Sequence, residues 1–254
     1  MRLVLLGNPV AHSRSPAIHS AALAHLGIAG EYLARRVDAG GVADAVGELR
    51  SGALDGANVT MPHKRLAARL CDRLDADAAA GRATNTLAIR DGELCGWNTD
   101  VAALRSVASG RPGERTVLVL GAGGAAAAAL VAFSADRVWV AARRPDAAAR
   151  HARQLCPSAR AVAWGMAVPG ALVVNATPIG MRGERLPEAV LAAAGGLIDL
   201  PYAAEATPAC AAARRLGINC VDGIDLLVAQ AAESFRIWTG VEAPVEVMRE
   251  AARA

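Results

Sequence analysis

The sequence predicts a two-domain α/β protein in which each domain is built on a mainly parallel sheet. Short apolar runs alternate with amphipathic segments over residues 1–100, and a second series of the same kind occupies residues 116–223. Strands separated by helices favour a parallel sheet, because the chain must cross over the sheet between neighbouring parallel strands. A chain of 254 residues is long enough to give two ordinary domains, each with its own core.

In the first series, strands are expected at RLVLLG, EYLARRV and GANVT, and helices at residues 16–26 and 41–50. ATNTL and GWNTD then flank AIRDGELCG, which is typical of a β-hairpin. A helix near 101–109 and the turn SGRPGER lead out of this region.

The second series predicts another parallel sheet with its own helices. Its expected strands lie at residues 116–120, 137–142, 171–177, 195–202 and 218–223. The segments 225–239 and 243–252 are expected to be helical and, on pattern alone, could cover either domain.

Composition narrows the class of protein. The net charge is only +3, too low to attract a phosphate backbone strongly, and aromatic residues, on which bases could stack, make up only 3% of the chain. No nucleic-acid partner is therefore expected. The N-terminal apolar run ends at Gly7, too early for a signal peptide, and glycines divide the uncharged stretch 117–133 into strand, turn and helix. Five scattered cysteines without a C-x-x-C pair indicate a reduced, cytoplasmic protein. No metal site is expected, because no metal-ligand spacing joins the histidines His12, His19, His25, His63 and His151.

GAGGAA has the pattern of a dinucleotide-binding turn. Gly121, Gly123 and Ala126 fit G-x-G-x-x-[GA] between a predicted strand and an alanine-rich helix. The first glycine permits the tight turn, and the second lets the backbone approach a pyrophosphate at the helix N-terminus. Glycines in an alanine-rich chain could also be simple turn residues, but the strand before and the helix after favour the cofactor.

The end of the next strand favours NADP over NAD. An acidic residue usually binds the ribose hydroxyls of NAD there, whereas this chain has Ala142, Arg143 and Arg144. Guanidinium groups match a 2′-phosphate that a carboxylate would repel. The alternative is a solvated pair of arginines, with Asp146 leaving NAD open.

Lys64 stands where a helix should begin. Residues 57–60 predict a strand, Pro62 suits a first helical position, and Leu66 and Leu70 continue at helical spacing. The helix dipole disfavours a cation in that turn, which indicates a role other than helix formation.

Ser13 and Ser15 precede Pro16 at another helix start. Ser15 is most simply interpreted as an N-cap, but two hydroxyls beside Arg14 would also form a carboxylate receptor. In the same way, Asn85 could stabilise a turn and Asp100 could cap a helix.

Taken in order, HSRSP, NVTMPHK, NTL, GWNTD, GAGGAA, NATPIG and DGIDLLVAQAAESF resemble the shikimate dehydrogenase family over nearly the whole chain. The resemblance implies a substrate-binding and catalytic domain at 1–101, joined by C-terminal helices at 224–254, and a Rossmann-type NADP domain at 102–223. It implies reversible, NADPH-dependent reduction of 3-dehydroshikimate to shikimate, without a metal, by a monomer or homodimer. Quinate or aminoshikimate dehydrogenase and a non-catalytic NADPH-binding regulator are the alternatives.

The resemblance also implies residue roles, which place Lys64 and Asp100 as the catalytic pair that assists proton transfer. Ser13, Ser15 and Tyr202 would bind the substrate carboxylate, and Thr60, Asn85 and Gln230 the ring hydroxyls. The expected cofactor-binding residues are Gly121, Ala122, Gly123, Gly124, Ala125, Arg143, Arg144, Asn175, Thr177 and Gly223.

Four positions depart from the commonest family pattern. Thr84 replaces a usual Val, Arg82 a usual Gly, Val101 a frequent Gly, and Ala142 the Asn of an Asn-Arg-Thr phosphate motif. These departures bear on how strictly NADP is preferred and on which ring substituents are accepted.

Overall fold

The computed structural model describes residues 1–109, 115–203 and 205–254, without the side chains of residues 147 and 151. Residues 110–114 of the predicted turn and the His151 side chain therefore lie outside what is described. The chain divides into unit 1, Met1–Ala103 with Leu227–Ala254, and unit 2, Leu104–Leu226. The sequence places these boundaries after residues 101 and 223.

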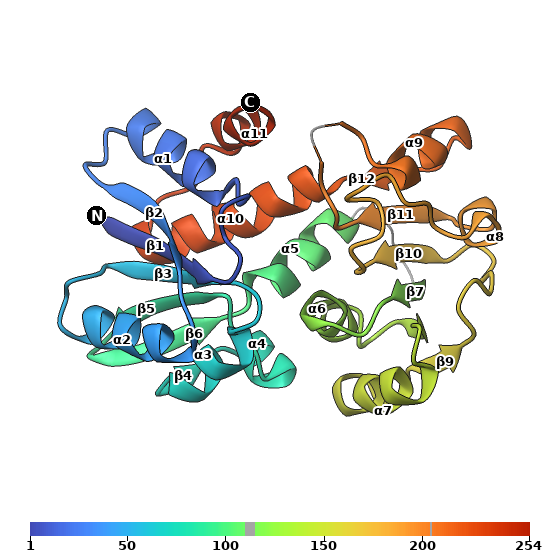
Figure 1. The fold of residues 1–254 in the computed structure, drawn as a ribbon, viewed down its shortest axis with the longest axis horizontal. Coiled ribbons are helices and arrows are strands. Elements are labelled where there is room, and N and C mark those ends of the chain that lie inside the picture. The colour runs from blue at the N-terminus through green and yellow to red at the C-terminus, as the bar shows by residue number, and fades with distance from the viewer. Residues whose placement is uncertain (110–114, 204) are drawn as a thin grey trace. The chain divides into compact units, whose positions relative to one another are not determined.

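Unit 1 contains a mixed sheet in the order β2-β1-β3-β5-β6-β4 (Figure 1). Strands β1, β2 and β3 are parallel, β5 is antiparallel to β3 and to β6, and β4 pairs in parallel with β6. The bounds are β1 (Arg2–Gly7), β2 (Glu31–Arg36), β3 (Gly56–Val59), β4 (Arg73–Leu74), β5 (Thr86–Arg90) and β6 (Glu93–Trp97). Among the described strands of this sheet, β5 thus runs against the other five, and the sheet is mainly parallel as the sequence predicts.

The hairpin β5–β6 is confirmed. Asp91 and Gly92 form its two-residue turn with φ of 52° and 80°. Positive φ at both positions gives a turn whose twist matches that of the flanking strands, which is why Asp-Gly is favoured there.

Helices of unit 1 cover this sheet. They are α1 (Ser15–His25), α2 (Ala39–Arg50), α3 (Lys64–Leu70), α4 (Ala76–Gly81), α10 (Gly223–Thr239) and α11 (Val245–Arg253), and α5 (Thr99–Ala108) begins in this unit. Each unit boundary falls inside a helix, α5 or α10. Pro62 precedes α3 instead of starting it, so the expected proline-initiated helix is wrong by two residues.

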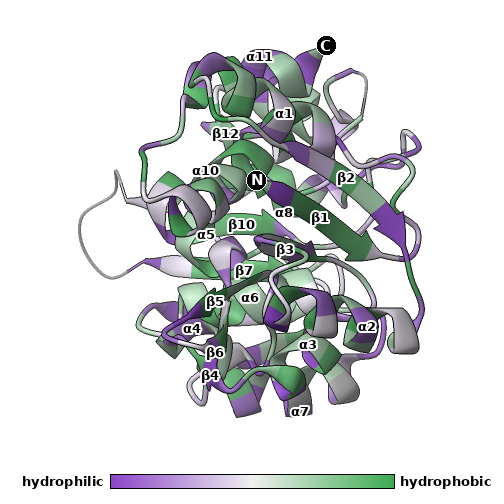
Figure 2. Cartoon of the chain, turned by 90° about the vertical axis from the view of Figure 1, so that its left-hand side faces the viewer, coloured by the Kyte–Doolittle hydropathy of each residue, from purple (hydrophilic) through white to green (hydrophobic). Residues whose placement is uncertain are grey.

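The C-terminal helices return to unit 1, as the family resemblance implies. The Trp238 indole of α10 donates to the Leu87 carbonyl at 3.0 Å, and a Cβ on Gly56 would overlap its ring at 2.4 Å. Figure 2 shows the inner strand β1 as apolar beyond its hydrophilic first end and its edge neighbour β2 as mixed, which matches their burial. The core between β1, β3 and α2 includes Leu6, Val42, Leu49 and Leu87.

Unit 2 is a parallel sheet in the order β12-β11-β10-β7-β8-β9. The strands are β7 (Thr116–Leu120), β8 (Arg137–Ala141), β9 (Arg160–Val162), β10 (Leu172–Asn175), β11 (Gly196–Asp199) and β12 (Cys220–Val221), and the helices are α6 (Gly124–Ala132), α7 (Pro145–Leu155), α8 (Glu188–Ala192) and α9 (Pro208–Arg215). This is the doubly wound dinucleotide-binding order. Strands β8 and β9 are added on one side of β7, and β10, β11 and β12 are added on its other side, so the strand order reverses between β7 and β10. A ligand binds such sheets at that reversal, outside the carboxyl ends of the strands.

Candidate active site

Lys64 occupies the first position of α3, within the first helical turn in which the sequence places it. The His63 ring bonds to the Val37 carbonyl at 3.0 Å, so it leaves the helix without a side-chain cap. The Lys64 carbonyl accepts from the Thr84 amide at 3.1 Å, which ties the start of α3 to the segment before β5. The backbone at Lys64 is therefore held on both sides.

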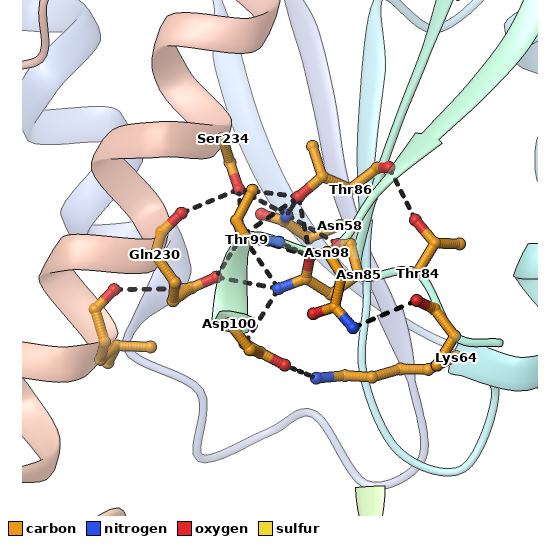
Figure 3. A network of polar contacts seen from close by, with 12 residues as sticks. Asn58, Lys64, Thr84, Asn85, Thr86, Asn98, Thr99, Asp100, Gln230 and Ser234 are labelled. Atoms are coloured by element: carbon orange, nitrogen blue, oxygen red, sulfur yellow. Dashed lines mark hydrogen bonds and ion pairs between the residues drawn. The ribbon is translucent and has the colours of Figure 1, made fainter. Parts of the chain in front are cut away.

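The Lys64 ammonium pairs with Asp100, with 2.5 Å between Nζ and Oδ2 (Figure 3). Asp100 lies in the first turn of α5, where the helix dipole favours a carboxylate. The two side chains are 24% and 23% exposed, so both remain reachable by a small molecule. The ion pair compensates the poor electrostatic position of Lys64.

Asn85 joins this pair to two further groups. Its side-chain amide donates to Asp100 Oδ1 at 2.9 Å and to Thr99 Oγ1 at 3.0 Å, and lies 3.4 Å from Gln230 Oε1. The side-chain oxygen of Asn85, Oδ1, accepts a hydrogen bond from the Thr99 backbone amide at 2.8 Å. The structure thus brings together four predicted site residues from α3, the β5 approach, α5 and α10: Lys64, Asn85, Asp100 and Gln230.

Behind Asn85 lies a fully buried polar layer that the sequence reasoning missed. Asn58 Nδ2 donates to the main-chain carbonyl of Asn85 at 2.9 Å, and the Tyr32 hydroxyl donates to Asn58 Oδ1 at 2.7 Å. Ser234 lies 2.8 Å from Thr86 and donates to the Gln230 carbonyl at 3.0 Å. The available signal was Asn58 itself, a polar residue in a buried strand that needs partners.

Ser13, Ser15 and Thr60 also belong to unit 1. Arg14, not Ser15, is the N-cap of α1, so the N-cap interpretation of Ser15 is wrong. Ser15 is buried, and its amide donates to Ser13 Oγ at 3.2 Å. Thr60 is half-buried, and its methyl group fills the place of a Cβ on Gly7. Tyr202 lies in unit 2, after β11, and is half-buried.

In unit 2 the glycine turn follows β7 and leads into α6. Gly121 has φ of +121°, and a Cβ there would lie 2.8 Å from the Ala176 carbonyl oxygen. A Cβ on Gly123 or Gly124 would meet nothing within 4 Å, and no side chain caps α6. The exposed backbone of Ala122, Gly123 and Gly124, with half-buried Ala125, leaves the helix N-terminus open to an anion. These residues fit a dinucleotide phosphate.

The other predicted cofactor residues lie at the same edge of the sheet. Arg143 and Arg144 follow β8 and are exposed, and Ala142 is buried where an NAD-binding acid would stand. Asn175 ends β10, and Thr177 follows in a turn beside Gly121. A Cβ on Gly223 would lie 2.4 Å from the Leu200 carbonyl oxygen, so only glycine allows that close approach.

Two sequence comparisons identify the family. Residues 5–87 match the model of the shikimate dehydrogenase substrate binding domain, and residues 223–253 that of the shikimate 5′-dehydrogenase C-terminal domain. A shikimate dehydrogenase (NADP(+)) of Archaeoglobus fulgidus is 38% identical, with 98% of this chain and 97% of the relative covered. The chain belongs to the shikimate dehydrogenase family.

Solved structures of this family share the fold. A shikimate 5-dehydrogenase from Thermus thermophilus, in complex with NADP(H) and shikimate, has a TM-score of 0.89 and 35% identity, covering 100% of this chain and 98% of that one. A shikimate dehydrogenase in complex with NADP+ has a TM-score of 0.91 and 30% identity, covering 99% and 94%. The predicted α/β class and Rossmann-type second sheet are confirmed.

Among the described residues, no group of three or more His, Cys, Asp or Glu could hold a metal ion. None of the described helices is both long and apolar enough to cross a membrane.

The five cysteines are all free, but two are not scattered in space. Cys210 on α9 and Cys220 on β12 have their sulfur atoms 2.9 Å apart. Sequence spacing did not indicate this pair, because the sheet brings the two residues together.

Proposed function

We propose that this chain is an oxidoreductase that reduces 3-dehydroshikimate to shikimate with NADPH and runs the reaction in reverse with NADP. Membership of the shikimate dehydrogenase family over nearly the full length supports this activity. The observation that carries the proposal is the Lys64–Asp100 ion pair, a partly exposed cation held in a helical position that disfavours it.

Lys64 is assigned to the reacting oxygen. NADPH, when bound, supplies the hydride for the carbonyl carbon. The carbonyl oxygen gains negative charge as the hydride arrives, and the Lys64 ammonium stabilises that charge and can deliver a proton. Asp100 holds the ammonium through Oδ2, and its Oδ1 is fixed by Asn85.

The remaining roles follow the family pattern. Ser13, Ser15 and Tyr202 are assigned to the substrate carboxylate, and Thr60, Asn85 and Gln230 to ring hydroxyls. The partly exposed hydroxyl of Ser13 and the amides of Asn85 and Gln230 are the donor types that such groups need.

The cofactor assignment is supported by the open N-terminus of α6 and the exposed arginines after β8. The turn Gly121–Ala125 would hold the pyrophosphate, Arg143 and Arg144 the 2′-phosphate, and Asn175, Thr177 and Gly223 the remainder of the dinucleotide. We assign the enzyme to the cytoplasm, since its cysteines are free thiols, and expect a monomer or a homodimer, which mass in solution distinguishes.

The test is a set of four steady-state assays that follow reduced-nicotinamide absorbance, crossing shikimate and quinate with NADP and NAD. Fast turnover with shikimate and NADP is expected. A higher kcat/KM with quinate and NAD would move the chain to a sister activity. No detectable turnover in any of the four assays, or with aminoshikimate, would indicate a non-catalytic NADPH-binding protein.

A further inference from the structure

Asp199 is a buried carboxylate to which the proposed function gives no role. It ends β11, is 0% exposed, and lies in register with Asn175 on the neighbouring strand β10. Burial raises its pKa, and hydrogen bonds from Thr207, Asn175 and Cys210 act in the opposite direction. A buried carboxylate costs folding free energy, so its retention calls for a reason.

The two oxygens of Asp199 face different parts of unit 2. Oδ1 accepts from Asn175 Nδ2 at 2.6 Å. Oδ2 accepts from the hydroxyl of Thr207, and the Cys210 thiol lies 3.6 Å away. Oδ1 therefore accepts a hydrogen bond from the end of β10, and Oδ2 accepts one from the N-cap residue of α9.

The Oδ1 contact fixes which way the Asn175 amide points. A carboxylate only accepts hydrogen bonds, so Asn175 must present its NH₂ group to Asp199 and its oxygen to the other side. That oxygen accepts from Thr177 N at 3.2 Å and from Thr177 Oγ1 at 2.6 Å. The NH₂ group also donates to the Ile179 carbonyl at 3.0 Å.

The turn wound around this amide lies against the glycine turn. Ala176 N donates to the Leu120 carbonyl at 2.9 Å, and the Ala176 carbonyl oxygen would be only 2.8 Å from a Cβ on Gly121. Thr177 Oγ1 accepts from Ile179 N at 3.1 Å, which closes the turn. A rotated Asn175 amide would face the Thr177 amide with its own NH₂ and lose both Thr177 bonds.

We propose that Asp199 is a positioning residue for the dinucleotide: it orients the Asn175 side-chain amide and thereby holds the 175–179 turn in place beside Gly121. This inference rests on the proposed function, because it takes the cofactor to bind at that turn. Asp199 itself touches only protein groups in the contacts above, so its effect on NADPH passes through Asn175.

The experiment uses the full-length protein and measures the Kd of NADPH by reduced-nicotinamide fluorescence, with thermal unfolding recorded without ligand. Asp199→Asn keeps the size of the side chain but offers one acceptor oxygen instead of two. Cys210→Ala is the matched control, because it removes a neighbour of the other oxygen and leaves Asn175 untouched. Should Asp199→Asn not fold, Asp199→Ser, which is too short to reach Asn175, takes its place.

We expect Asp199→Asn to weaken NADPH roughly tenfold, the effect of losing about one buried hydrogen bond. Its kcat at saturating NADPH should change less than about twofold, because the reacting groups of unit 1 are unaltered. Cys210→Ala should lower the unfolding temperature and leave the Kd unchanged.

A double-mutant cycle separates positioning from general destabilisation. If Asp199 acts through Asn175, adding Asp199→Asn to Asn175→Ala should weaken NADPH no further. Additive losses, or a normal Kd in an Asp199→Asn protein that is merely less stable, would overturn the inference. Wild-type protein that fails to bind NADPH would overturn both proposals, whereas binding without turnover would overturn the proposed function alone.

Discussion

At the scale of single residues, the position of Lys64 is explained by its partner. A cation in the first turn of a helix is disfavoured by a fraction of a kcal/mol, and the ion pair with Asp100 at 2.5 Å opposes that cost. The exposed neighbour Arg65 in the same turn forms no comparable ion pair among the described contacts. Lys64 and Arg65 therefore lie in the same helical turn and differ in whether an ion pair holds the side chain, so Arg65 can serve as the control for Lys64.

Lys64→Ala should lower kcat by about 10²- to 10³-fold and change KM far less, because its interaction strengthens in the transition state. Steady-state kinetics with shikimate and NADP measures both constants. Arg65→Ala is the control and should retain wild-type kcat. A change confined to KM in Lys64→Ala would make Lys64 a binding residue.

Arg143→Ala should weaken NADPH by about tenfold or more and leave NADH nearly unaffected, since only NADPH carries the 2′-phosphate. Direct titration of both cofactors measures this, and NADH is the internal control. Equal losses for the two cofactors would contradict the assignment.

The burial of Asp199 also predicts a pH dependence of stability. Its pKa is raised in the folded protein, so its contribution to stability is complete below the unfolded pKa of about 3.9 and is lost as pH rises through the folded value. The free energy of unfolding of the wild type, minus that of Asp199→Asn, should therefore fall as pH rises from about 4. Urea unfolding at several pH values measures it, and a flat difference would show that Asp199 does not titrate in this range.

At the scale of elements, helix ends show where the chain departs from its family. Arg82 is the C-cap of α4, with φ of 47° in the left-handed region. The usual family residue there is glycine, which adopts this conformation without strain. Thr84, by contrast, is well accommodated, since its hydroxyl donates to the Trp97 carbonyl at 2.6 Å.

Arg82→Gly should raise the free energy of unfolding by about 0.5 kcal/mol, because relief of left-handed strain exceeds the added entropy of the unfolded chain. Gly92→Ala is the opposite control. Gly92 has φ of +80° and open space around its Cβ position, so a loss of about 1 kcal/mol should come from backbone strain alone. Urea unfolding measures both, and a destabilised Arg82→Gly would mean that the arginine side chain contributes contacts of its own.

At the scale of the whole molecule, the two units predict separate ligand responses. Unit 2 carries the glycine turn, and unit 1 carries the Lys64–Asp100 pair. NADP should therefore slow hydrogen exchange chiefly in segments 116–126 and 171–179, and shikimate chiefly around residues 84–100. Exchange followed by mass spectrometry measures this, and the α2 helix serves as an unaffected reference. Protection by NADP of unit 1 alone would contradict the cofactor assignment.

The sequence by itself determined the alternation of strands and helices, the Asp-Gly hairpin, the presence of Lys64 in the first turn of α3 and the glycine turn before α6. Each depends on local chemistry within a few residues: side-chain periodicity, positive φ, and the backbone needs of a helix end. The order of family motifs then pointed to Lys64 and Asp100 as candidates, and the structure joins their side chains in an ion pair.

Only the tertiary structure decided which polar groups meet. Ser234 reaches Thr86 across 148 residues of chain, and Asp199 reaches Asn175 across 24, because parallel strands and a returning helix bring them together. The short strands β4 and β9 were likewise missed, since two or three residues carry no periodicity and become strands only by pairing with a neighbour. Hydrogen bonds between distant residues depend on the register of the whole sheet, which no local stretch of sequence specifies.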